Sequence, residues 1–186
     1  MFSKKTRHEI SLLTSTVPAH ASHWNGVWLS IVFELFVEPQ TRAWYSIQPW
    51  PRDRHAMYVR RTSALTVVRH NLDLSEGVGT NPAPVSDVQG VVLIDYLNTP
   101  DWGDGQAVKG LEERMRSQAE YTLGMNAGEY AYGNKALYFV MGVGPHWRYG
   151  VRDAQGFRYL CKWHNRLDDV DAYVDFLRLV ELVEQL

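Results

Sequence analysis

Cysteine is almost absent from this chain, because Cys161 is the only one among 186 residues. A single cysteine excludes any disulfide within the chain, and this favours a reducing compartment. Long apolar runs are missing as well. The basic residues at 1–7 are not followed by the apolar segment of a signal peptide, and the apolar stretches at 90–97 and 136–143 are too short to cross a bilayer. We therefore expect an intracellular protein, cytoplasmic or nuclear, with no membrane contact.

An excess of basic residues is missing too. The formal net charge is −2, whereas proteins that bind nucleic acid mainly through phosphates usually carry a basic excess. Aromatic residues, by contrast, are abundant, with seven Trp and ten Tyr. Such a surplus is typical of a bulky core, and it also suits a binding surface, where Trp, Tyr and Arg supply most of the affinity.

Hydrophobic periodicity alternates between the helical and the strand pattern along the chain. Helices are predicted where apolar residues recur at helical spacing: residues 22–38, 108–122 and 170–180. Strands are predicted at residues 43–48, 57–61, 64–70, 90–97 and 135–144, with a hairpin at 147–152 and 157–163. Residues 73–89 contain two glycines and two prolines, and they predict a long loop.

This order predicts a single α/β (α+β) domain of three layers, with a mixed central sheet flanked by helices. We assign residues 21–186 to the domain and residues 1–20 to a loosely ordered N-terminal arm. Residues 90–97 form an almost uninterrupted apolar run around Asp95. They therefore predict a central strand that is covered on both faces, with the helix around residues 111–122 packed over it.

The order helix, three strands, helix, strand resembles the core of the PD-(D/E)XK nuclease-like superfamily. Local sequences add to this resemblance: Trp24-Asn25, residues 45–49 (YSIQP), residues 91–95 (VVLID), Gln118 and residues 141–147 (MGVGPHW). They are similar to uncharacterised fungal members with a degenerate active site. The likeness covers about residues 24–149 and implies a restriction-endonuclease-like core.

The resemblance also implies where catalytic residues should lie. The superfamily has an acid on its second core strand and an acid-x-lysine triplet on its third. The acids hold Mg²⁺, and the metal and the lysine activate water against a phosphodiester. Asp95 matches the second acid, but Leu97 stands where lysine is expected, and residues 64–68 contain no acid.

An active site would therefore need replacements from elsewhere in the chain. Asp73, Asp87 or Glu34 would supply the missing acid, and Lys109 the missing lysine. Because two relocations are required together, a degenerate site without a cofactor is favoured over an Mg²⁺-dependent nuclease.

Two pairs of zinc-ligand residues occur at short spacing: His20 with His23, and Cys161 with His164. The pairs are far apart in sequence, so ordinary structural roles are favoured over a zinc site. Cys161 is also a candidate nucleophile if His146 or His164 serves as its base, although an inert thiol is favoured.

The predicted hairpin interleaves aromatic and basic residues. Because alternate residues of a strand share a face, Arg148 and Arg152 can line one side with Arg158 and Lys162 opposite, and Trp147 lies beside them. Such a ribbon suits phosphate contact or base stacking. The alternative, which is favoured, is an outer hairpin with aromatics on the core and charges in water.

These observations lead to a macromolecule-binding module on a nuclease-like fold as the expected function. The module would be catalytically degenerate, and its partner would be a protein or nucleic acid. An Mg²⁺-dependent nuclease that cleaves phosphodiester bonds is one alternative. A structural or homo-oligomerising protein, with the aromatic surplus at its interface, is the other.

Overall fold

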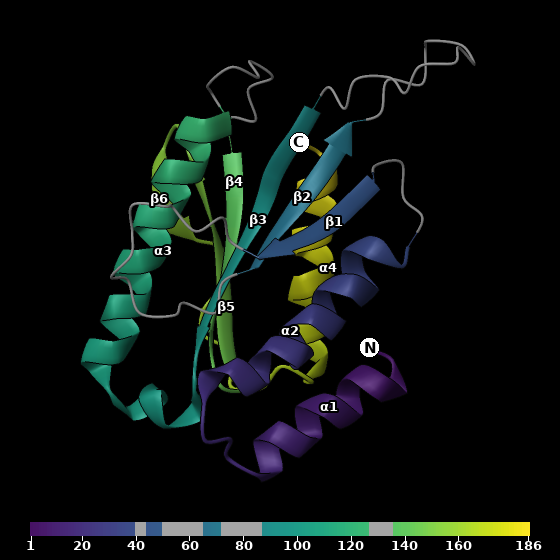
Figure 1. The fold of residues 1–186 in the computed structure, drawn as a ribbon, viewed down its shortest axis with the longest axis vertical. Coiled ribbons are helices and arrows are strands. Elements are labelled where there is room, and N and C mark those ends of the chain that lie inside the picture. Colours follow the sequence, from purple (N-terminus) through teal and green to yellow (C-terminus); the bar gives the residue numbers. More distant parts are fainter. Residues whose placement is uncertain (40–43, 50–64, 72–86, 127–135) are drawn as a thin grey trace.

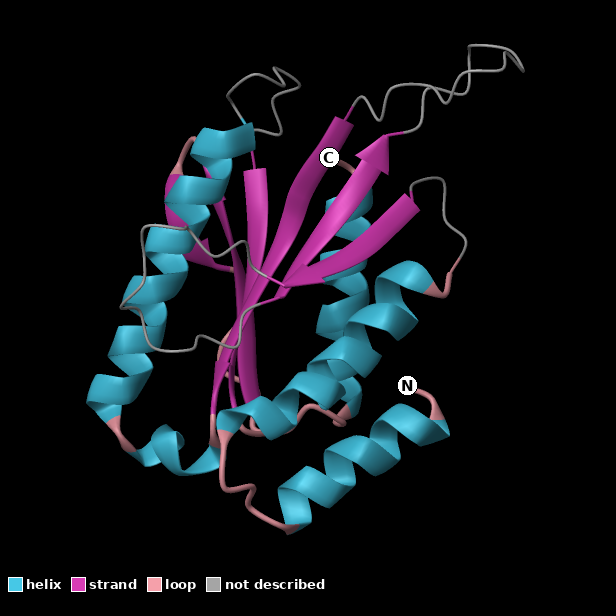
Figure 2. Ribbon diagram, in the orientation of Figure 1, coloured by secondary structure: helices cyan, strands magenta, loops and turns pink. Residues whose placement is uncertain are grey.

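The computed structural model describes residues 1–39, 44–49, 65–71, 87–126 and 136–186. Six strands form one mixed sheet, in which the strands lie side by side in chain order (Figures 1 and 2). Neighbouring strands are antiparallel except for β3 and β4, which are parallel. The strands are β1 Trp44–Pro49, β2 Leu65–Asn71, β3 Asp87–Leu97, β4 Ala136–Val143, β5 His146–Asp153 and β6 Gly156–Tyr159.

Helices cover both faces of the sheet. On one face, α3 (Gly105–Asn126) connects β3 to β4, as a parallel strand pair requires. On the other face lie α1 (Lys4–Ser15), α2 (Trp24–Val32) and α4 (Val170–Glu184) (Figure 1). A 3₁₀ turn, η1 (Ala21–His23), precedes α2, and a π-helical turn, η2 (Phe33–Val37), extends it. A further 3₁₀ turn, η3 (Thr99–Gly103), precedes α3. Among the described residues, none of the helices combines the length and the hydrophobicity that crossing a bilayer demands.

The prediction of a central strand at residues 90–97 is confirmed. β3 is the third of six strands and is buried on both faces. Leu93 packs with Leu111 and Met115 of α3, whereas Ile94 and Tyr96 belong to the core on the opposite face. The helix expected over this strand is therefore present as well.

Two boundaries differ from the expectation. β3 begins at Asp87, so the last residues of the predicted loop belong to the strand. β6 ends at Tyr159 rather than at residue 163, because the chain bends away and returns only as an isolated bridge between Trp147 and His164. The predicted strand at residues 57–61 lies outside the described residues.

The N-terminal segment is helical and packed instead of loosely ordered. Ser3 begins α1 by accepting a hydrogen bond from the Thr6 backbone N–H. Phe2 and Ile10 are buried in the core, with Leu13 packed against them. Three apolar residues make a weak periodic signal, which explains why the sequence pattern did not reveal this helix.

The packing of α2 on the sheet is a close contact between Trp28 and Gly142 of β4. A Cβ atom on Gly142 would lie 2.6 Å from Trp28 Cζ2. Gly142 pairs with Tyr96 on one side and Trp147 on the other, so the glycine leaves a slot between two aromatic residues. Trp28 is fully buried there.

We expect Gly142→Ala to destabilise the protein by about 1–3 kcal/mol, because overpacking a rigid buried indole forces backbone or rotamer shifts. Gly110→Ala on α3 is the matched control, since a Cβ there meets nothing within 4 Å, and it should stabilise by roughly 0.5–1 kcal/mol through higher helix propensity. Urea unfolding followed by circular dichroism measures both. Equal effects from the two substitutions would contradict the close packing of Trp28 against Gly142.

Candidate functional site

Asp95 is a fully buried carboxylate on the face of β3 that α3 covers. Arg114 of α3 donates a hydrogen bond from Nε to Asp95 Oδ2 at 3.1 Å. The backbone N–H of Tyr96 donates to Oδ1 at 2.8 Å. Both carboxylate oxygens therefore have partners from the protein itself.

The electrostatics of this pair are dominated by burial. Loss of hydration raises the pKa of Asp95 above the usual carboxyl value, and the nearby positive charge of Arg114 opposes that rise. Arg114 is 32% exposed, so water weakens its attraction for the carboxylate. The arginine is nevertheless the only charge of opposite sign bonded to Asp95 among the described residues.

Glu34 lies on the opposite side of the sheet and has a structural role. Its Oε1 accepts the Ser3 backbone N–H at 2.7 Å, and its Oε2 accepts the Thr6 hydroxyl at 2.7 Å. The carboxylate thus holds the beginning of α1 against η2. Glu34 does not share a cleft with Asp95.

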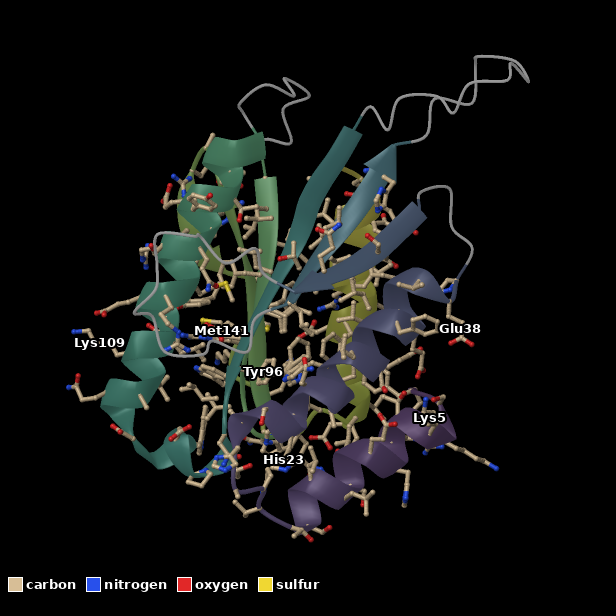
Figure 3. The ribbon with its side chains drawn as sticks, in the orientation of Figure 1. Lys5, His23, Glu38, Tyr96, Lys109 and Met141 are labelled. Carbon is tan, nitrogen blue, oxygen red and sulfur yellow. The ribbon has the colours of Figure 1, made fainter. Side chains whose placement is uncertain are left out.

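Lys109 does not approach Asp95 either, and the backbone of Asp87 lies far from it along the same strand. Lys109 Nζ lies 3.8 Å from Glu113, and both side chains are well exposed; Figure 3 shows Lys109 pointing away from the body of the protein, whereas Tyr96 lies in the interior. Asp87 begins β3, eight residues before Asp95, which corresponds to roughly 26 Å along a strand. Asp73 lies outside the described residues.

The residues expected to form a magnesium site are therefore not brought together by the described part of the structure. Asp95 belongs to no described group of three or more metal-ligating side chains. Leu97 packs against the apolar cluster under α3, where the superfamily would have a lysine.

On the hairpin, Trp147, a candidate for the binding surface, is fully buried, in agreement with the favoured alternative of aromatics on the core. Its ring stacks on Phe176 of α4 with centroids 3.7 Å apart. Strand alternation explains this position, because Trp147 and Tyr149 face the α4 side while Arg148 faces the α3 side.

The hairpin arginines have carboxylate partners. Arg148 is ion-paired with Glu112, its guanidinium carbon lies 3.5 Å from the centroid of the Tyr159 ring, and its side chain is only 12% exposed. Arg152 binds Glu120 through two hydrogen bonds of 2.7 and 3.0 Å.

The two remaining cations of the hairpin are more accessible. Arg158 donates to Asp153 at 2.7 Å. Lys162 is exposed, and none of the described carboxylates pairs with it. Of the four predicted phosphate-binding cations, only Lys162 is thus available without displacing a carboxylate.

The two pairs of predicted zinc ligands do not meet in the described structure. His20 precedes η1 and His23 ends it, with their rings stacked at a centroid distance of 6.2 Å. The group of metal-ligating side chains that the described residues do form consists of Cys161, His164 and Asp175. Asp175 of α4 was not predicted, and no spacing rule links it to the other two residues.

Cys161 does not have the environment of a nucleophile. Burial raises the pKa of its thiol to about 11, whereas reactive cysteines have depressed values. His146, one of its two candidate bases, is stacked on Trp102 with ring centroids 3.9 Å apart.

Comparisons of the chain with protein-family models, with curated proteins and with solved structures find no match.

We expect Arg114→Met to destabilise the protein by about 2 kcal/mol at neutral pH, since it leaves an ionised carboxylate buried without its partner. The substitution raises the folded-state pKa of Asp95 further. Its cost should therefore shrink as the pH falls, because Asp95 becomes protonated in the folded state. Urea unfolding at neutral and mildly acidic pH measures this.

Lys109→Met on the same helix is the control, since an exposed ion pair contributes under about 1 kcal/mol. A cost for Arg114→Met that grows towards acidic pH would contradict the assignment of Asp95 as the charge that Arg114 compensates.

Proposed function

We propose that this protein is a macromolecule-binding module on a nuclease-like fold and that it does not cleave phosphodiester bonds. The observation that carries the proposal is the state of Asp95, which is buried and bound by Arg114 beneath α3. The element order α2, β1, β2, β3, α3, β4 supports the kinship with the PD-(D/E)XK superfamily.

Catalysis by this superfamily would require Asp95 to hold a divalent cation. A cation would have to replace Arg114, whose positive charge lies in contact with the carboxylate and repels another positive ion. Glu34 is bound at the start of α1, and Leu97 offers no amine. The fold alone does not supply the missing chemistry.

A protein partner is favoured over nucleic acid because the cations of the hairpin are compensated. Arg148, Arg152 and Arg158 each contact a carboxylate. A phosphate would have to break these pairs to gain its own contacts. The net charge of −2 adds no general attraction for a polyanion.

Exposed apolar residues on α4 give the protein a surface suited to a protein partner. Val170, Val174 and Leu177 are 59%, 42% and 41% exposed. They recur at intervals of four and three residues, so they form one stripe on the helix. The buried stripe of α4, with Phe176 and Leu179, faces the core.

We expect no cleavage of plasmid DNA or RNA by the purified protein in the presence of Mg²⁺ or Mn²⁺, and no difference between the natural chain and Asp95→Asn. Gel electrophoresis of the nucleic acids over time measures this. Cleavage by the natural chain that Asp95→Asn abolishes, with the fold of the variant verified by circular dichroism, would establish the nuclease alternative instead.

The partner class is tested separately by fluorescence anisotropy with labelled DNA and RNA at low salt. We expect no saturable binding. Saturable binding that weakens in Lys162→Glu but not in Lys109→Glu would assign a nucleic-acid partner to the hairpin.

Self-association is a second candidate function, and the α4 stripe is the observation that favours it. Intervals of four and three residues are those of a helix–helix seam. If two copies of α4 paired antiparallel about Val174, Asp171 of each copy would lie near Arg178 of the other, which gives opposite charges across a two-fold axis. Apolar residues would thus meet apolar residues across the axis, and Arg178, which also contacts Asp175 of its own helix, would face a carboxylate of the other copy.

For this candidate we expect the mass measured by light scattering after size-exclusion chromatography to rise above the monomer with concentration. Val174→Asp should return the protein to a monomer, because it buries a charge at the centre of the seam. Leu12→Asp, at an exposed apolar position on α1, should leave the association unchanged. A monomer at all concentrations, or equal effects from both substitutions, would contradict self-association through α4.

A further inference from the structure

Where the chain leaves the sheet after β6, it brings together three side chains that zinc commonly binds. Cys161 and His164 lie in the segment between β6 and α4, and Asp175 lies on α4. We propose that Cys161, His164 and Asp175 form a binding site for a divalent transition metal such as zinc, with one coordination position left open. The inference does not depend on the proposed function.

The distances are compatible with such an ion. Cys161 Sγ, a ring nitrogen of His164 and a carboxylate oxygen of Asp175 all lie within 4.8 Å of one another. Metal–ligand distances near 2.0–2.3 Å in a tetrahedron put ligand atoms roughly 3.3–3.8 Å apart, so the separation of each pair has to change by at most about 1.5 Å. The hydrogen bond between His164 Nε2 and Asp175 Oδ2, now 2.8 Å, would open slightly to admit the ion.

The position of His164 is held by the sheet rather than by a flexible loop. Its backbone exchanges two hydrogen bonds with Trp147, of 3.1 and 2.8 Å. Its ring stacks on the Trp147 ring at a centroid distance of 4.8 Å. Because Trp147 is part of the core, the imidazole has little freedom to reorient, which lowers the cost of ligation.

The other two ligands have supporting contacts of the kind that surround metal sites. Arg178 donates to Asp175 Oδ1 at 3.1 Å and leaves Oδ2 for the site. The Tyr149 backbone N–H points to Cys161 Sγ at 3.4 Å. A thiolate bound to a metal would accept this hydrogen bond more strongly than a neutral thiol does.

The side chains are sheltered but reachable, since His164 and Asp175 are mostly buried and Cys161 is half-buried. Without a metal, burial raises the pKa of the Cys161 thiol to about 11, with a smaller contribution from Asp175. Binding must therefore release the thiol proton. Metal affinity is therefore pH-dependent, because the thiolate is the form that binds the ion.

Three protein ligands and one open position are the composition of zinc sites that exchange water or substrate, whereas structural sites have four protein ligands. Water would hold the fourth position here. Because the ligands come from both the hairpin end and α4, an ion at this position would also tie α4 to the sheet.

Cobalt titration of chelator-treated protein tests the site. Since Cys161 is the only cysteine, a sulfur-to-cobalt charge-transfer band in the near ultraviolet can arise from no other residue. We expect one cobalt ion per chain, the charge-transfer band, and loss of that band on addition of zinc. Cys161→Ser should abolish the band, and Asp175→Asn should weaken cobalt affinity by at least about tenfold.

The double substitution His20→Ala and His23→Ala is the matched control. It removes the other predicted pair of zinc ligands, which lies apart from Cys161, and it should leave cobalt binding unchanged. Absence of the band at millimolar cobalt would overturn the proposal. Metal binding that depends on His20 and His23 but not on Cys161 or Asp175 would overturn it equally.

A measurement on the natural chain avoids reliance on variants that fold poorly. The rate at which a thiol reagent modifies Cys161 should fall several-fold in zinc and remain constant in magnesium, since Mg²⁺ prefers oxygen ligands. An equal rate with and without zinc would also overturn the site.

Discussion

The packing of Trp28 into the slot at Gly142 is the contact on which the rest of the architecture depends. It places α2 directly over the centre of the sheet, between Tyr96 on β3 and Trp147 on β5. Phe176 of α4 stacks on Trp147 from the same side. Two helices, α2 and α4, and two strands, β3 and β5, thus contribute to one group of packed rings, and a group of buried rings has few alternative arrangements.

This arrangement separates the residues that a nuclease would need to combine. Tyr96 points to the face of the sheet that α2 and α4 cover. The preceding residue, Asp95, must therefore point to the opposite face, under α3. Glu34 lies in η2, directly after α2, and is therefore on the same face as α2. The alternation of β3 places Asp95 on the α3 side, where it is the buried partner of Arg114, and the position of η2 places Glu34 on the other side.

Hydrophobic periodicity predicts much of the fold but less of the candidate site. The central strand was predictable because apolar residues occupy both odd and even positions in 90–97. Since alternate residues of a strand point to opposite faces, this pattern indicates burial on both faces. The partner of Asp95 was not predictable, since Arg114 is 19 residues away on another element. Asp175 was missed for the same reason.

Alternation on β5 separates its side chains into two groups. It does not show which group faces which helix layer when both faces are covered, and so Trp147 is a candidate both for the surface and for the core. The pairing of Arg148 and Arg152 with Glu112 and Glu120 depends likewise on the packing of α3. The sequence alone therefore indicated basic residues but not that they are neutralised.

The tight turns between β4, β5 and β6 have a consequence for how the chain folds. Gly144, with φ of +58°, and Gly156, with φ of +108°, reverse the chain within a few residues, so these three strands pair through contacts that are local in sequence. β1, β2 and β3 pair only after the intervening residues 50–64 and 72–86 are spanned, which costs more loop-closure entropy. The C-terminal half of the sheet should therefore assemble first and act as the template onto which the N-terminal strands are added.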